Sequence, residues 1–109
     1  MTEVELAWMA GIVEGEGCFC LRRGDRRYSP EYRMPILRVG MTDEDVVRRL
    51  QDLWPAKMYG PYQYGSRKPF WTWEVWGQRL TNLLPLLYPL MGKRRQGKID
   101  EMKEYLKCA

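Results

Sequence analysis

The sequence contains no histidine among its 109 residues, and this absence excludes several kinds of active site. HNH nucleases, HEXXH metalloproteases and Ser-His-Asp hydrolases all need an imidazole as a metal ligand or as a base. The three cysteines, Cys18, Cys20 and Cys108, are odd in number and lack C-x-x-C spacing. The sequence therefore indicates neither a disulfide framework nor a zinc site.

Long apolar segments and targeting signals are also missing from the chain. No apolar run approaches the length of a membrane span, and no signal peptide is visible. We therefore expect a soluble, intracellular protein without a membrane partner, in a cytoplasm, a nucleoid or an organelle matrix. The length suits one modest core, so we expect residues 1–109 to form a single domain.

The most unusual segment that is present is a predicted helix ending in two carboxylates. Thr2 and Glu5 form a T-x-x-E capping box, so we expect this helix to begin at Glu3. It ends at Glu14 and Glu16, where the partial negative charge of a helix C-terminus disfavours each acid by about 0.3–1 kcal/mol. A divalent cation would remove this conflict, because it binds carboxylate and carbonyl oxygens together. The alternative is an ordinary amphipathic helix with solvated glutamates.

The same segment carries a resemblance to a known family. Residues 9–17, Met-Ala-Gly-Ile-Val-Glu-Gly-Glu-Gly, resemble the nine-residue signature of the LAGLIDADG homing endonucleases. Ala10 and Gly11 match that signature directly, and Glu14 and Glu16 stand at its two aspartates. The resemblance implies a site-specific endonuclease that hydrolyses double-stranded DNA with a divalent metal, Mg²⁺ or Mn²⁺.

The resemblance also implies which residues form the active site. Glu16 would be catalytic and would bind the metal through its carboxylate, with the backbone carbonyl of Gly15 as a second ligand. Lys93 would be the family's basic catalytic residue, which stabilises developing phosphate charge or orients water, and Lys98 is the alternative. Met41 departs from the family, which often has a polar residue at that point.

Apolar periodicity predicts a mixed domain in the order α-β-β-α-β-β-α-α. The expected segments are strand pairs at 18–27 with 32–41 and at 57–64 with 70–76, and further helices at 42–54, at 80–87 and from about 93. This order resembles the LAGLIDADG domain, an α+β fold of αββαββα type. In that family a four-stranded antiparallel sheet forms a saddle over the DNA, and the helices pack on one face of the sheet.

Basic residues are concentrated on the first predicted strand pair. The formal net charge is +4, and residues 21–40 alone hold six arginines against two acids. Such clusters are often only solvated surface, but arginines on strands beside an acidic metal-site candidate favour phosphate and base contacts. The predicted DNA-binding residues are Arg22, Arg26, Tyr32, Arg38, Thr72 and Glu74. A two-sided sheet whose polar face is merely hydrated is the alternative.

One copy of the signature in one short domain has a consequence for assembly. Cutting two DNA strands requires two acidic sites close together, so the resemblance implies a homodimer whose signature helices pack at a two-fold axis. The small residues Ala10, Gly11 and Gly15 would allow that close contact. Protein symmetry then implies a palindromic or near-palindromic target.

Two other functions stay open at this point. The same fold could serve a non-cleaving protein that binds nucleic acid, such as an intron RNA maturase or a DNA-binding regulator. The aromatic residues at 59–64 and 71–76 could instead stack the bases of a single strand. Alternating tryptophans such as Trp71 and Trp73 are more often core residues, and we expect that here.

Overall fold

The computed structural model describes residues 1–23 and 33–106. Arg26 and Tyr32, two of the predicted DNA-binding residues, lie outside the described residues. The elements are α1 (Glu3–Glu16), β1 (Gly17–Arg23), β2 (Arg33–Met41), α2 (Glu44–Leu53), β3 (Lys57–Tyr62), β4 (Phe70–Trp76), α3 (Gly77–Leu87), the 3-10 helix η1 (Tyr88–Leu90) and α4 (Lys93–Leu106). The predicted order is confirmed, and η1 is an additional turn between the last two helices.

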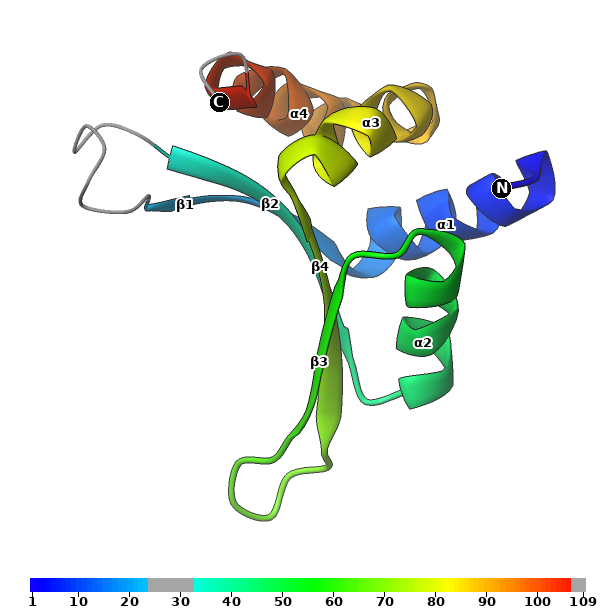
Figure 1. The fold of residues 1–109 in the computed structure, drawn as a ribbon, viewed down its shortest axis with the longest axis vertical. Helices are drawn as coiled ribbons and strands as arrows, with labels where there is room; N and C mark the ends of the chain where they lie inside the picture. The colour runs from blue at the N-terminus through cyan, green and yellow to red at the C-terminus, as the bar shows by residue number, and fades with distance from the viewer. Residues whose placement is uncertain (24–32, 107–109) are drawn as a thin grey trace.

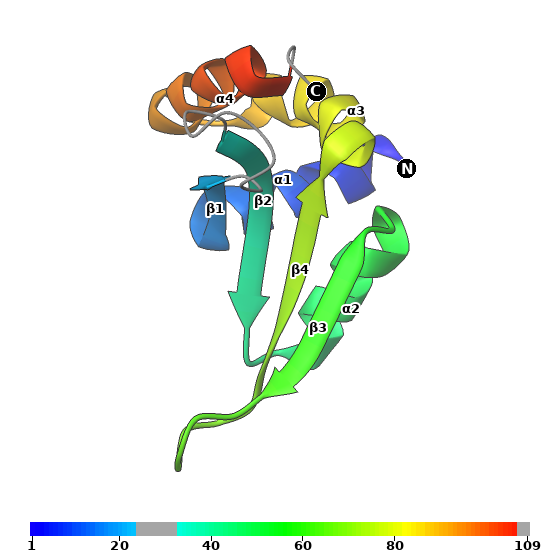
Figure 2. The ribbon, with the colours of Figure 1, turned by 60° about the vertical axis from the view of Figure 1, so that its left-hand side comes forward.

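The four strands form one antiparallel sheet in the order β1-β2-β4-β3. Phe19 of β1, Leu37 of β2 and Val75 of β4 lie directly opposite one another and are all buried. The sheet is curved, with the helices on one side and its other face open (Figures 1 and 2). This is the predicted α+β architecture. Among the described residues, no helix is long and apolar enough to cross a membrane.

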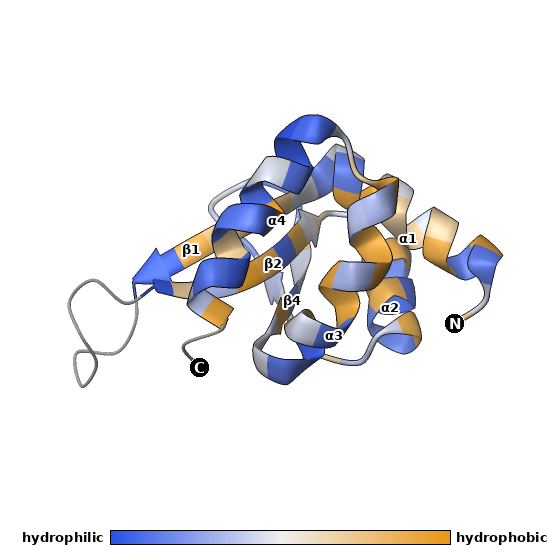
Figure 3. Ribbon diagram, turned by 90° about the horizontal axis from the view of Figure 1, so that it is seen from above, coloured by the Kyte–Doolittle hydropathy of each residue, from blue (hydrophilic) through white to orange (hydrophobic). Residues whose placement is uncertain are grey.

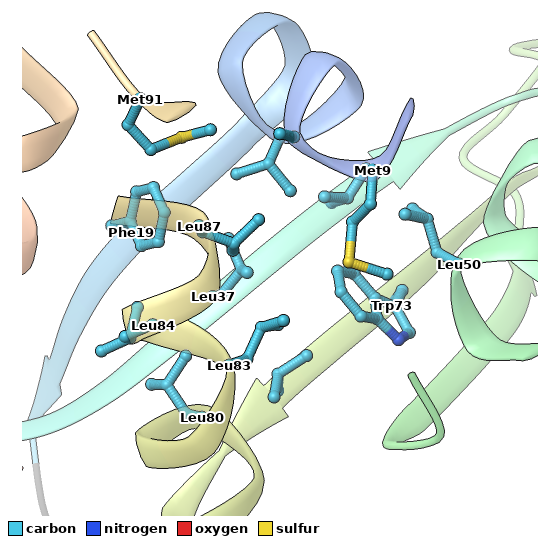
Figure 4. Close-up of a cluster of buried hydrophobic side chains, with 14 of the residues drawn as sticks. Met9, Phe19, Leu37, Leu50, Trp73, Leu80, Leu83, Leu84, Leu87 and Met91 are labelled. Carbon is cyan, nitrogen blue, oxygen red and sulfur yellow. The ribbon is translucent and has the colours of Figure 1, made fainter. Parts of the chain in front are cut away.

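The core fills the space between the sheet and the helices, and Trp73 lies near its centre (Figure 4). The Trp73 side chain is fully buried, and its indole Nε1 donates a hydrogen bond to the carbonyl oxygen of Trp54 at 3.1 Å. Met9 of α1 and four leucines of α3 are buried in the same cluster. Burial of each such side chain stabilises the fold by about 1.5–3 kcal/mol. Trp73 is therefore a core residue, as predicted.

Local sequence signals account for both ends of α1. Thr2 Oγ1 accepts a hydrogen bond from the Glu5 N–H at 3.1 Å, and Glu5 Oε1 accepts one from the Thr2 N–H at 2.8 Å. The predicted capping box is thus confirmed. At the other end, a Cβ on Gly17 would lie 2.6 Å from the carbonyl oxygen of Val13, so only glycine fits this exit from the helix.

Element boundaries differ from the predictions where polar residues hide the pattern. α3 begins at Gly77, three residues before the predicted start, because the polar residues there carry no apolar period. Gly77 has a φ of 63°, a left-handed conformation that glycine adopts without steric cost. β3 ends at Tyr62 rather than at residue 64, after an irregularity in its pairing with β4.

Candidate functional site

The C-terminus of α1 is held by Arg95, which lies on α4. Its guanidinium donates hydrogen bonds to the carbonyl oxygen of Glu14, at 3.0 Å, and to the carbonyl oxygen of Gly17. Its Nε lies 3.9 Å from the Glu14 carboxylate. A cation in this position offsets both the negative end of the helix and the acid placed there. The chain itself therefore relieves part of the electrostatic conflict that its sequence predicted.

Glu14 also joins the start of α4 to the end of α1. The backbone N–H of Gly92 donates to Glu14 Oε2 at 3.3 Å, and a Cβ on Gly92 would come within 2.8 Å of Glu14 Oε1. Lys93 is the next residue and is exposed at the first turn of α4. The structure thus brings the segment that carries the predicted basic residue against the signature helix. Lys98, the alternative, pairs with Glu101 at 3.4 Å.

Glu16 differs from Glu14 in its surroundings. It is the exposed last residue of α1, and no ion pair or side-chain hydrogen bond joins it to another described residue. It faces an open groove of about 600 Å³. The residues that line the groove with Glu16 include Cys18, Arg38, Met41, Arg67 and Lys68. One available carboxylate therefore faces a space whose other charged lining residues are all cations.

The donor groups at this site suit a particular kind of metal ion. Within the two described stretches, no three acidic, cysteine or histidine side chains converge on one point. A structural zinc or calcium cage is thus not formed by these residues. Mg²⁺ commonly uses one or two carboxylates and completes its shell with waters and substrate phosphates. Glu16, with a backbone carbonyl such as that of Gly15, fits such an ion.

The open face of the sheet carries an ion cluster centred on Glu74. This carboxylate is only 7% exposed and lies 3.5 Å from Arg38 Nε and 3.7 Å from Arg22 Nη2. Burying a charged side chain to this extent is costly unless opposite charges pair with it. Both arginines are about half exposed, so Glu74 orients two cations whose outer surfaces remain available.

The predicted DNA-binding residues therefore fall into two groups. Arg22 and Arg38 present surface on the open face, whereas Thr72, at 1% exposed, and Glu74 are buried. We expect Thr72 and Glu74 to affect DNA binding indirectly, by positioning the residues that they contact. Their role in DNA binding stays a prediction.

An aromatic hairpin extends the open face beyond the body of the molecule (Figure 1). Tyr62 and Tyr64 contact Phe70 with ring centroids 5.4 and 5.9 Å apart. Tyr64 is 65% exposed, and Arg67 and Lys68 lie in the connection between the strands. The exposed aromatics are thus tyrosines of this hairpin rather than the tryptophans of β4.

Solved structures with this arrangement of elements decide the fold. I-CvuI in complex with its target has a TM-score of 0.70 at 18% identity, over 92% of this chain and 64% of that one. I-CeuI, a group I intron-encoded homing endonuclease complexed with DNA, has a TM-score of 0.75 at 13% identity, over 97% and 55%. A LAGLIDADG meganuclease, I-CpaMI, bound to uncleaved DNA, has a TM-score of 0.71 at 16% identity, over 94% and 35%.

This chain has the LAGLIDADG homing endonuclease fold. It spans less than two thirds of the length of I-CvuI and of I-CeuI. No family model matches the sequence, and no curated protein matches it. At identities below one fifth, the likeness concerns the fold, so activity has to be argued from the site.

Helix α1 has one side that the other described residues leave uncovered. A Cβ on Gly11 or on Gly15 would meet no atom within 4 Å, and Val4 is 77% exposed on the same helix. Ala10 differs from these residues, because it is 4% exposed and packs into the core of its own chain. The open small-residue surface consequently rests on Gly11 and Gly15.

Arg95 is the residue of this site that sequence reasoning missed. It stands in the basic run at 93–98, from which sequence reasoning selected only Lys93 and Lys98. Nothing in that run separates Arg95 from Arg94, because the distinction depends on which face of α4 meets α1. The usable signal was the acidic C-terminus of the first helix, because such an end favours a cation from another part of the chain.

Proposed function

We propose that this chain is one subunit of a metal-dependent DNA endonuclease that cuts both strands of a near-palindromic duplex as a homodimer. The observation that carries the proposal is the environment of Glu16. This carboxylate is exposed at the end of the signature helix, and the groove beside it is lined by Arg38, Arg67 and Lys68. A carboxylate next to cations that suit phosphates is the donor set that phosphodiester hydrolysis requires. The DNA in the I-CvuI and I-CeuI structures supports DNA as the partner.

Each residue has a distinct part in this chemistry. Glu16 and the carbonyl oxygen of Gly15 would hold Mg²⁺ or Mn²⁺. Such an ion, when bound, supplies charge neutralisation at the scissile phosphate and lowers the pKa of a bound water. Arg38 binds backbone phosphate, and Lys93 stabilises the negative charge that develops on the reacting phosphate. Arg95 hydrogen-bonds to the carbonyl oxygens of Glu14 and Gly17 and so fixes the backbone on both sides of the proposed metal ligands.

The homodimer supplies the second active site. One chain holds a single Glu16, and two strands require two such groups. The open side of α1 around Gly11 and Gly15 suits packing against a second copy, because backbones can approach closely where no side chains intervene. The middle of α1 is largely apolar between charged ends (Figure 3). Two-fold packing there would bring two Glu16 side chains to one end of the interface.

A second candidate function is a non-cleaving protein that binds nucleic acid, either an intron RNA maturase or a DNA-binding regulator. Met41 favours it, since this residue lines the Glu16 groove where the family often has a polar side chain. A thioether is a weak hydrogen-bond acceptor and cannot donate, so it holds water poorly. Binding would then persist without hydrolysis.

The first experiment is cleavage of a randomised duplex DNA library by the purified chain. We expect breaks at one near-palindromic site with Mg²⁺ or Mn²⁺ and none with EDTA. Sequencing the ends then gives the target. Enrichment of a sequence by binding, without any metal-dependent break, would contradict the nuclease and favour the second function.

Glu16→Gln separates a role at the metal from a role in folding. The substitution removes the charge with little change of shape, so we expect target binding to be kept and cleavage to be lost. Glu3→Gln, at the exposed start of the same helix, is the matched control and should cut normally. Loss of binding together with cleavage in Glu16→Gln alone would show that Glu16 is structural.

A further inference from the structure

Two cysteines on the open face of the sheet lie in direct contact beside the Glu16 groove. Cys18 and Cys20 occupy alternate positions of β1, so both point away from the core, which holds Phe19 between them. Their Sγ atoms are 2.9 Å apart, and both thiols are free. Neither the fold nor the proposed hydrolysis uses this pair.

We propose that Cys18 and Cys20 form a reversible disulfide within β1, and that its formation controls the adjoining site. The reaction takes a low-molecular-weight disulfide as the oxidant. A sulfur of Cys18, the more exposed residue, displaces one small thiol and forms a mixed disulfide. Cys20 then attacks the Cys18 sulfur and displaces the second small thiol. The protein loses two electrons and two protons, and the small disulfide gains them as two thiols.

The geometry of the strand makes this bond possible but strained. In an extended strand, the Cα atoms of residues two apart are separated by about 6.6 Å. Disulfides join Cα atoms up to about 6.8 Å apart and most often nearer 5.5–6 Å, so closure would shorten β1 locally. In the described sheet, β1 is an edge strand that pairs with β2 alone, so its backbone can bend locally without breaking a second strand pairing. A strained disulfide is more easily reduced, which suits a reversible modification.

The surroundings connect the thiol pair to the proposed site. Cys18 lies opposite Arg38 in the pairing of β1 with β2, and both line the same groove as Glu16. Burial, followed by the contact with Cys18, raises the pKa of Cys20 to about 11, so this thiol is protonated at neutral pH and the more exposed Cys18 reacts first with the small disulfide. Shortening of β1 would displace the end of α1 and Arg38 relative to each other.

The chemical test uses intact mass after treatment with oxidised glutathione, in a Cys108→Ser background that leaves only this pair. We expect the protein to lose two hydrogen atoms and to carry no glutathione, and a reductant should restore its mass. Cys20→Ser, in the same background, should retain glutathione as a stable adduct on Cys18, because no second thiol can displace it. Glutathione retained on the unmutated pair would overturn the proposal.

The functional test compares cleavage by the oxidised and the re-reduced protein, and this arm rests on the proposed nuclease. Since a misplacement of about 1 Å at an active site can cost about 100-fold in rate, we expect at least a tenfold loss that a reductant reverses. The double variant Cys18→Ser/Cys20→Ser, which has no thiol to oxidise in the same background, should cut at the same rate under both conditions. Equal rates for the oxidised and reduced pair would overturn the control function. A chain that never cuts DNA would refute the nuclease while the mass test still decides the disulfide.

Discussion

Replacement of Arg95 by methionine tests whether this side chain holds the signature helix in place. Methionine keeps most of the length and apolar contact but removes every donor. Two hydrogen bonds from a charged group to carbonyl oxygens would be lost, together with the interaction with the Glu14 carboxylate. The Arg95 side chain is 13% exposed, so water replaces these bonds only in part.

The expected loss can be estimated from these contacts. A hydrogen bond to a charged group contributes about 1.5–3 kcal/mol, and the half-exposed Glu14 adds little because solvent screens it. Some recovery by water at the carbonyl oxygens lowers the sum, so we expect Arg95→Met to reduce the free energy of unfolding by about 2–4 kcal/mol. The assay is urea denaturation followed by tryptophan fluorescence, which the buried Trp73 should report.

The neighbouring Arg94 provides the matched control. It is exposed on the same turn of α4, and no described contact ties it to α1, so Arg94→Met should change stability by less than about 0.5 kcal/mol. Arg95→Lys should be intermediate, since a single ammonium cannot reproduce the planar fork that reaches two carbonyls. Equal stabilities of Arg95→Met and Arg94→Met would refute the reasoning.

Three further substitutions test the core, the helix exit and the proposed interface. Trp73→Ala should lower the free energy of unfolding by about 3–5 kcal/mol in the same urea assay, because it removes the largest buried side chain; a loss below 1 kcal/mol would argue against a core role. Gly17→Ala should destabilise by about 1–3 kcal/mol, since its Cβ would collide with a backbone oxygen, and a neutral effect would contradict this close approach. Gly11→Leu should convert the proposed homodimer to a folded monomer in sedimentation, whereas Gly97→Leu, at an equally open glycine of α4, should leave it dimeric. Identical sedimentation of the two leucine variants would exclude α1 as the interface.

The fold was predictable because local signals and the global arrangement agree. The capping box at Thr2 fixed the start of α1, and alternation of apolar residues fixed β2 and β4. Alternation also placed Arg38 and Glu74 on one face, and their pairing across the strands confirms that assignment. An assignment of helices and strands from a single sequence is dependable when capping signals, apolar periodicity and strand pairing all agree in this way.

Sequence reasoning missed two contacts, the ion cluster around Glu74 and the pair of thiols on β1. Glu74 is buried beside two arginines of other strands, and neither arginine is visible in the local pattern around residue 74. Cys18 and Cys20 were set aside because their number and spacing fit no framework, yet alternation along one strand is sufficient to bring two thiols into contact. Both contacts are identified by the folded structure rather than by the sequence pattern.

The two glutamates at the end of α1 show how the structure sharpens the sequence argument. Residues two apart on a helix point about 200° apart around its axis, so Glu14 and Glu16 cannot share one environment. Glu14 faces α4, where Arg95 and the N–H of Gly92 satisfy it. Glu16 faces the open groove, and none of the described side chains pairs with it. A stable helix end does not require this second acid, and the proposed function gives Glu16 a partner in a metal ion held together with DNA phosphate.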